Sequence, residues 1–252
     1  MGRKLGQHFL RDKNILKKIV QSAEINENDN VLEIGAGDGA LTSFLLMKAR
    51  KVIACEIDED LYEKLRNKFR FSENLILRKG DFLKIDFSFL DPSDYPNKVT
   101  ANIPYYLTTP LIFNLLLRHE IKDIYLTLQK EYAERLIAKP KSKSYGAITI
   151  NINVLAVPEI KFFISKRSFS PPPKVDSAFV FLKKRETPLI PYEKFPEFSS
   201  FVRKTFSHRR KTLKNALKYA GIKIPEEFAG KRPEELSVEE YVFLFNFLNP
   251  NR

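Results

Sequence analysis

The sequence predicts an α/β protein, in which a mainly parallel sheet with helices on both faces is followed by a small helical domain. Between residues 30 and 130, short apolar runs alternate with segments of helical period, as in a parallel sheet. Two further apolar runs resemble a closing pair of strands, and beyond them the apolar spacing becomes helical. We therefore expect a sheet-containing domain over residues 1–184 and a helical domain over residues 185–252.

The individual elements follow from these patterns in chain order. Strands are expected where an apolar run is short and bounded by turn residues, and helices where apolar residues recur every three or four positions. The expected strands are 30–34, 52–55, 75–77, 99–101, 124–128, 160–164 and 178–182; the expected helices are near 41–49 and 59–69, from 108, and within 198–206, 213–217 and 241–248. Residues 145–155 are ambiguous, because isoleucine and valine alternate there as in a strand while the order of elements favours a helix.

Composition narrows the class of protein. The chain has 252 residues, and none of its apolar runs approaches the length of about 20 residues that a membrane helix needs. The basic start lacks the apolar stretch of a signal peptide, so we expect a cytoplasmic protein without a membrane partner. One cysteine excludes a disulfide within the chain, and with only three histidines a metal site is not expected.

The net charge of +12 favours a polyanionic partner. The charge is concentrated in residues 203–218, which contain seven Lys or Arg and no acid. A solvated face usually mixes the two signs, so this segment favours a nucleic acid over an unspecialised surface. The candidates for phosphate contacts are Arg209, Arg210, Lys211 and Lys214.

A glycine-rich turn follows the first expected strand, in the run Val31-Leu32-Glu33-Ile34-Gly35-Ala36-Gly37-Asp38-Gly39. Glycines such as Gly35 and Gly37 allow a tight turn and a close approach of backbone to a ligand. The third glycine comes one residue too early for the dinucleotide fingerprint. An acid before a G-x-G-x-G spacing instead resembles the first motif of S-adenosylmethionine-dependent methyltransferases, whose cofactor has no pyrophosphate.

The next two strands end in acidic residues that suit the rest of this cofactor. Glu56 lies 19 positions after Gly37, where a carboxylate can accept the ribose hydroxyl protons. Asp81 can accept from the adenine amine, while Phe82 packs against the ring. The alternatives are an acidic helix start for Glu56 and an ordinary Gly-Asp turn for Asp81.

The tetrapeptide Asn102-Ile103-Pro104-Tyr105 closes a fourth strand. It combines an amide oxygen, a backbone carbonyl and an aromatic face, which are the groups needed to hold a planar amino-purine. Asn102 and the carbonyl of Ile103 can accept the two amine hydrogens, and Tyr105 can stack on the base. The alternative is an Asx-turn that merely ends the strand.

Taken in order, these motifs resemble the ribosomal RNA adenine dimethyltransferase family. The opening Lys4–Leu10, the stretches already described, Gln129-Lys130-Glu131 and Phe169–Ser177 follow one another as in that family, over about the whole chain. The resemblance implies that His8 and the backbone of Leu10 contact the cofactor and that Phe169 stacks on the target base opposite Tyr105. The three prolines after Ser170 favour an exposed loop at Phe169 over a place in the core. His8 is a departure, since many relatives carry Asn there.

The resemblance favours the branch that acts on small-subunit RNA. It implies an enzyme that forms dimethyladenosine at two adjacent adenosines near the 3′ end of 16S rRNA, within a pre-30S particle. S-adenosylhomocysteine is the product, no metal takes part, and a monomer is expected. Three alternatives stay open: a large-subunit methyltransferase of the macrolide-resistance type, a DNA-adenine or protein-glutamine methyltransferase, and a non-catalytic RNA-binding assembly factor.

Overall fold

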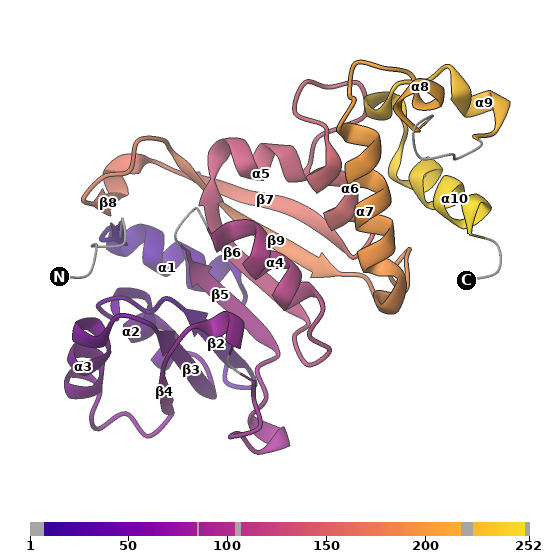
Figure 1. Cartoon of the computed structure of the whole chain (residues 1–252). Helices are drawn as coiled ribbons and strands as arrows, with labels where there is room; N and C mark the ends of the chain where they lie inside the picture. Colours follow the sequence, from indigo (N-terminus) through magenta and orange to yellow (C-terminus); the bar gives the residue numbers. More distant parts are fainter. Residues whose placement is uncertain (1–7, 85, 104–106, 218–223, 250–252) are drawn as a thin grey trace. The chain divides into compact units, whose positions relative to one another are not determined.

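The computed structural model describes residues 8–84, 86–103, 107–217 and 224–249. The chain divides into two compact units, the first made of residues 1–133 and 159–183 and the second of 134–158 and 184–252. Figure 1 labels their elements. The segment 134–158 therefore groups with the C-terminal helices. That the chain forms two independent domains with a boundary after residue 184 stays a prediction.

Among the described residues, seven strands form one mixed sheet in the order β4-β3-β2-β5-β6-β9-β7. The strands are β2 (Asn30–Ile34), β3 (Lys51–Glu56), β4 (Leu75–Lys79), β5 (Lys98–Asn102), β6 (Asp123–Gln129), β7 (Ala156–Ile164) and β9 (Ser177–Lys184). The first five are parallel, and β9 pairs antiparallel with β6. The expected mainly parallel sheet is confirmed.

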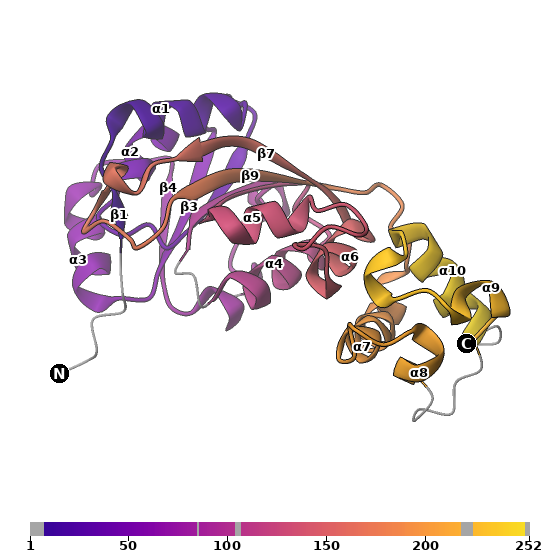
Figure 2. The same cartoon turned by 90° about the horizontal axis from the view of Figure 1, so that it is seen from above.

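The helices of the first unit cover both faces of this sheet. They are α1 (Lys13–Ser22), α2 (Ala40–Leu46), α3 (Glu59–Lys68) and α4 (Thr108–Leu116), and α5 (Lys130–Leu136) leads into the second unit. Figure 2 shows α1 and α2 on one side of the strands and α4 on the other. Leu16 of α1 and Leu45 of α2 join Val31 and Val52 of the sheet in one buried apolar cluster.

Helix α1 is absent from the expectations drawn from the sequence, although it has a clear start. The Asp12 carboxylate accepts the backbone N–H groups of Asn14 at 2.9 Å and Ile15 at 3.3 Å, which caps the first turn. Three side chains of α1 are buried: Leu16, Ile19 and Val20. Ile15, Leu16, Ile19 and Val20 recur at helical spacing, so the sequence itself indicates this helix.

A second, two-stranded sheet joins distant parts of the first unit. Strand β1 (Phe9–Leu10) pairs antiparallel with β8 (Phe169–Ser170). The N–H of Arg11 continues the pairing by donating to the Ser168 carbonyl at 2.8 Å. Two-residue strands are too short to show an alternating pattern, which is why the sequence did not reveal them.

The second unit contains the remaining helices. They are α6 (Ala147–Asn153), α7 (Phe195–Phe206), α8 (Leu213–Leu217), α9 (Glu226–Ala229) and α10 (Val238–Leu248). Aromatic rings of α7 and α10 pack together, with the Phe198 and Phe245 centroids 5.3 Å apart. The ambiguous segment 145–155 contains α6, whose buried run from Ile148 to Ile152 hides the helical period. None of the helices in the described ranges is long and apolar enough to cross a membrane.

Candidate functional site

The register of the parallel strands gathers the predicted site residues at one edge of the sheet. Ile34 at the end of β2 pairs with Cys55 on one side and with Ala101 on the other. The residues that follow these positions therefore emerge side by side. Backbone bonds continue the alignment, because the Gly35 N–H donates to the Cys55 carbonyl at 2.9 Å and the Gly80 N–H to the Glu56 carbonyl at 2.9 Å.

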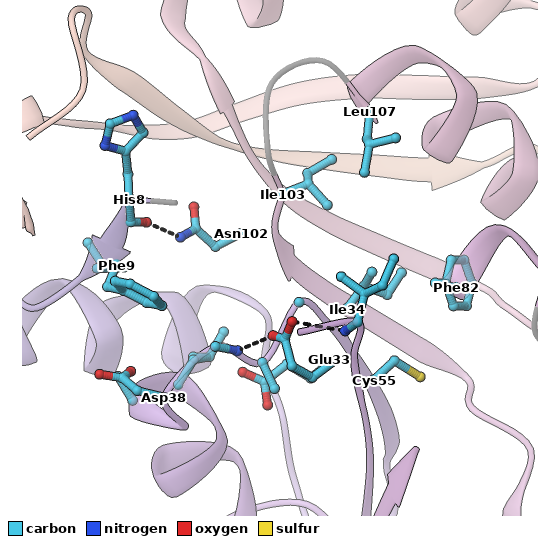
Figure 3. Close-up of a pocket in the computed structure, with 18 of the residues that line it drawn as sticks. His8, Phe9, Glu33, Ile34, Asp38, Cys55, Phe82, Asn102, Ile103 and Leu107 are labelled. Atoms are coloured by element: carbon cyan, nitrogen blue, oxygen red, sulfur yellow. Dashed lines mark hydrogen bonds between the residues drawn. The ribbon is translucent and has the colours of Figure 1, made fainter. Parts of the chain in front are cut away.

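A cavity of about 160 Å³ opens at this edge, within the first unit. Figure 3 shows residues that line it. The lining includes every residue expected to bind the cofactor, namely His8, Leu10, Gly35, Gly37, Glu56, Asp81, Phe82 and Asn102, together with Ile103 and Phe169. The predicted stacking residue Tyr105 lies outside the described residues, as do Pro104 and the first residues of the opening motif.

The glycine turn on the cavity wall has a backbone that other residues rarely adopt. Gly35 has φ of +72° and Gly37 has φ of +61°, in the left-handed region. A Cβ atom at Gly37 would also lie 3.0 Å from the Phe9 ring. The turn therefore needs glycine for its conformation and for the space between backbone and ring.

Glu56 is buried beside this turn, with 4% of its surface exposed. Its Oε2 accepts the Gly37 N–H at 2.8 Å, and its Oε1 accepts the N–H groups of Ile57 and Asp58, each at 2.9 Å. Three backbone donors thus hold the Glu56 side chain in a single orientation. Each of the two Glu56 oxygens can accept a further hydrogen bond, so a diol could donate its two hydroxyl protons to them.

Glu33 also lines the cavity, although the sequence indicated it only as part of the glycine-turn motif and not as a site residue. It is 2% exposed, and its Oε2 has no hydrogen-bond partner among the described residues. Burial raises the pKa of Glu33 to about 8, and the nearby Glu56 adds to the shift. Figure 3 shows Glu33 at the cavity. Its position directly before the glycine turn was the feature of the sequence that could have indicated a place at the cavity.

Asn102 is oriented by the N-terminal strand. Its Nδ2 donates to the His8 carbonyl at 3.1 Å, as Figure 3 shows. The His8 imidazole in turn bonds through Nδ1 to the Pro171 carbonyl at 2.8 Å. Because this hydrogen bond uses the amide nitrogen of Asn102, the Oδ1 atom of Asn102 points away from it and can still accept a hydrogen bond.

Phe169 corrects one expectation. The three prolines after Ser170 suggested an exposed loop, but Phe169 is 4% exposed and belongs to the main apolar cluster of the first unit. Pairing between β1 and β8 draws the ring inward. It nevertheless lines the cavity, so the residue serves both the core and the cavity wall.

The basic residues lie in the second unit and are of two kinds. Arg210, Lys211 and Lys214 are exposed. Arg209, which was expected with them as a phosphate contact, is engaged inside the unit: its guanidinium pairs with Glu234 and donates to the carbonyl oxygens of Lys143 at 3.1 Å and Ser142 at 3.3 Å. It ties three segments of the second unit together.

The one cysteine is not suited to nucleophilic chemistry. Cys55 is 2% exposed, and burial raises the pKa of its thiol to about 12. The described part of the chain also contains no group of three or more His, Cys, Asp or Glu residues that could hold a metal ion. The residues that line the cavity offer hydrogen-bond acceptors, backbone amides and aromatic rings.

Comparisons with known proteins agree with this geometry. A family model described as "Ribosomal RNA adenine dimethylase" matches residues 1–245. The Ribosomal RNA small subunit methyltransferase A of Caldanaerobacter subterraneus subsp. tengcongensis is 38% identical, over 98% of this chain and 96% of the relative. A dimethyladenosine transferase from Plasmodium falciparum has a similar structure, with a TM-score of 0.84 and 31% identity over 96% of this chain and 98% of that one. The 23S rRNA methyltransferase ErmE is also similar, with a TM-score of 0.71 and 27% identity over 96% and 99%.

Proposed function

The chain belongs to the ribosomal RNA adenine dimethylase family, and from this premise we propose how its own residues carry out the reaction. It is an S-adenosylmethionine-dependent methyltransferase that dimethylates adenosine in the 16S RNA of the small ribosomal subunit. We propose that the targets are two adjacent adenosines near the 3′ end. We further propose that a monomer meets them in the cytoplasm, within a pre-30S particle. The names of relatives such as the Caldanaerobacter protein support the choice of subunit.

The cavity fits S-adenosylmethionine in several independent ways. Gly37 leaves room that a Cβ atom would fill, and the Oε2 atom of Glu33 has no hydrogen-bond partner within the described part of the chain. The cofactor would supply a methyl group already activated by a positive sulfur. We assign Glu56 to its ribose hydroxyls, Asp81 and Phe82 to its adenine, and the segment from His8 to Leu10 with the turn from Gly35 to Gly37 to its amino-acid end.

The catalytic step rests on alignment at Asn102. An adenine amine is a poor nucleophile, because its lone pair is delocalised into the ring. Asn102 Oδ1 and the carbonyl of Ile103 each accept one amine hydrogen, which turns the lone pair toward the methyl group and stabilises the charge that grows on nitrogen. The hydrogen bond from Asn102 to the His8 carbonyl preorganises this amide. No residue need act as a general base, since the proton can leave to water.

The target base must leave its RNA helix to enter the cavity. We propose that Tyr105 and Phe169 then hold it between two rings, each contact being worth about 1–3 kcal/mol. Arg210, Lys211 and Lys214 are proposed to contact RNA phosphates. The convergence of the cofactor residues and Asn102 on one cavity is the observation that carries this proposal.

The decisive experiment supplies labelled cofactor with immature 30S particles in one reaction and undermethylated 50S particles in another. We expect label in two adjacent dimethyladenosines of 16S rRNA and none above background in the 50S reaction. Label confined to 23S rRNA would assign the chain to the large-subunit activity that the name of ErmE describes. If the protein binds the 30S particles but transfers no methyl group to them, it acts only as an assembly factor.

A further inference from the structure

A guanidinium group lies close to two aromatic rings, one of which belongs to the proposed adenine subsite. The Arg118 Cζ atom is 5.0 Å from the Phe82 centroid and 4.7 Å from the Phe87 centroid, within the range of a cation–π contact. Both rings are buried, each with 4% of its surface exposed. Phe82 belongs to the lining of the cavity, whereas Arg118 and Phe87 do not. The three residues will be called the Arg118 bracket.

The Arg118 bracket connects two sides of the cavity. Phe82 begins the short 3-10 helix η1 (Phe82–Lys84), which directly follows Asp81. Arg118 lies just after α4, the helix whose Leu111 lines the cavity, and η1 packs against α4. The Arg118 Nε atom donates to Asn114 Oδ1 of the same helix at 3.0 Å. A single side chain is therefore anchored on α4 and reaches over the ring on η1.

The ring of Phe82 needs such support to bind a base well. A ring that contacts a purine contributes most when its orientation is set before binding, because ordering it afterwards costs free energy. A guanidinium over a ring restricts that orientation, and here the contact is partly desolvated, which strengthens it. Figure 3 places Phe82 well apart from Asn102 and His8, so the support acts on a part of the cavity remote from the reacting atoms.

We propose that Arg118 is a positioning residue for the adenine of the cofactor, acting through the ring of Phe82. The inference rests on the proposed function, in which Phe82 contacts that adenine. Lysine should replace it only in part, because a compact ammonium lacks the planar, delocalised guanidinium that stacks on aromatic rings. Phe87 completes the arrangement from outside the cavity, so its removal should have a related effect.

The test compares two ligands by calorimetric competition: S-adenosylhomocysteine, and S-ribosylhomocysteine, which lacks the base. We expect Arg118→Met to weaken S-adenosylhomocysteine by about three- to tenfold and to leave S-ribosylhomocysteine unchanged. Turnover at saturating cofactor should stay within about twofold, so that the KM for the cofactor changes and kcat does not. Arg118→Lys should recover part of the loss, and Arg66→Met, on the exposed face of α3, serves as the matched control.

A merely structural role predicts a different pattern, in which both ligands weaken in parallel with the melting temperature. The variant Phe87→Leu tests the positioning role of Arg118 independently. Its effect on S-adenosylhomocysteine should be non-additive with that of Arg118→Met, since either change releases the same ring. Parallel losses for the two ligands, or additive effects of the two variants, would overturn the inference.

Phe82→Ala separates this inference from the function on which it rests. If Phe82→Ala weakens S-adenosylhomocysteine and Arg118→Met does not, the positioning role is wrong and the adenine subsite stands. If wild type binds the ligand and Phe82→Ala leaves the affinity unchanged, the adenine lies elsewhere and both assignments fail.

Discussion

The cavity of the first unit and the basic surface of the second unit use side chains in opposite ways. At the cavity, Glu56 and Asn102 are held in one orientation by short bonds to the backbone. On the basic surface, Lys211 and Lys214 are exposed, and a neighbouring cation could replace either of them. Single substitutions should therefore have large effects where buried partners set the geometry of a side chain. They should have small, salt-dependent effects where only charge matters.

The largest effect is expected at Asn102, which tests the claim that geometry governs the cavity. Asn102→Ala removes an acceptor that acts on the developing positive charge, and such a loss costs about a factor of 10² to 10³ in kcat. The affinity for S-adenosylhomocysteine should fall by no more than a few-fold. Single-turnover methylation and calorimetry measure the two quantities, with Asn67→Ala on the exposed side of α3 as the control. Equal losses in both would reduce Asn102 to a cofactor contact.

Glu56 should come next, because it combines a cofactor contact with three backbone bonds. In Glu56→Gln, the amide nitrogen faces backbone N–H donors, and one acceptor for the ribose is lost. Hydrogen bonds to a charged group are worth about 1.5–3 kcal/mol each, so we expect affinity for S-adenosylhomocysteine to fall by about a hundredfold. Calorimetry beside Glu63→Gln, a partly exposed glutamate of α3 that pairs with Arg66, measures the loss. A change below about threefold would contradict the ribose assignment.

Glu33 extends the comparison to pH. Its pKa in the folded chain is about 8, above the ordinary value of 4.5. Between these values the unfolded chain has lost a proton that the folded chain retains. The contribution of Glu33 to stability is therefore complete below pH 4.5 and is lost as pH rises toward 8, by up to about 1.4 kcal/mol per pH unit.

Glu33→Gln should remove this dependence, because glutamine does not titrate. Urea unfolding of both proteins at pH 5.5, 6.5 and 7.5 measures the difference in their free energies of unfolding. That difference should move in favour of the variant as pH rises, while the titration of all other groups cancels. Two curves that stay parallel over this range would show that Glu33 ionises normally in the fold.

Features that depend on local sequence were predictable, whereas features that depend on contacts between distant segments were not. Strand ends such as Ile34 and Asn102 were predictable, because apolar runs and turn residues are local features. The convergence at the cavity follows from the parallel order of those strands. The pairing of β1 with β8 and the burial of Phe169 were not predictable from period or composition, since they depend on contacts between segments about 160 residues apart.

The contacts of Arg209, on the basic surface, were likewise not predictable from the sequence. Its position within a run of cations gave no indication that Glu234 and two carbonyl oxygens bind it. We expect Arg209→Gln to lower the free energy of unfolding by about 1 kcal/mol, since the ion pair is partly exposed and contributes little by itself. The salt dependence of RNA binding should stay as in wild type. A reduced salt slope without loss of stability would return Arg209 to the group of phosphate contacts.

The smallest effect is expected at Lys214, which gives the sharpest contrast with Arg209. Lys214→Gln removes one exposed charge, so the free energy of unfolding should change by less than about 0.5 kcal/mol. If Lys214 contacts a phosphate, the slope of log affinity against log salt concentration should decrease in size by about 1. Filter binding of 16S rRNA fragments at several salt concentrations measures this slope, with Lys64→Gln on the exposed side of α3 as the control. Adding Arg210→Gln and Lys211→Gln should extend the decrease in proportion, because interchangeable charges act additively. An unchanged slope in the triple variant would show that RNA binds through another surface.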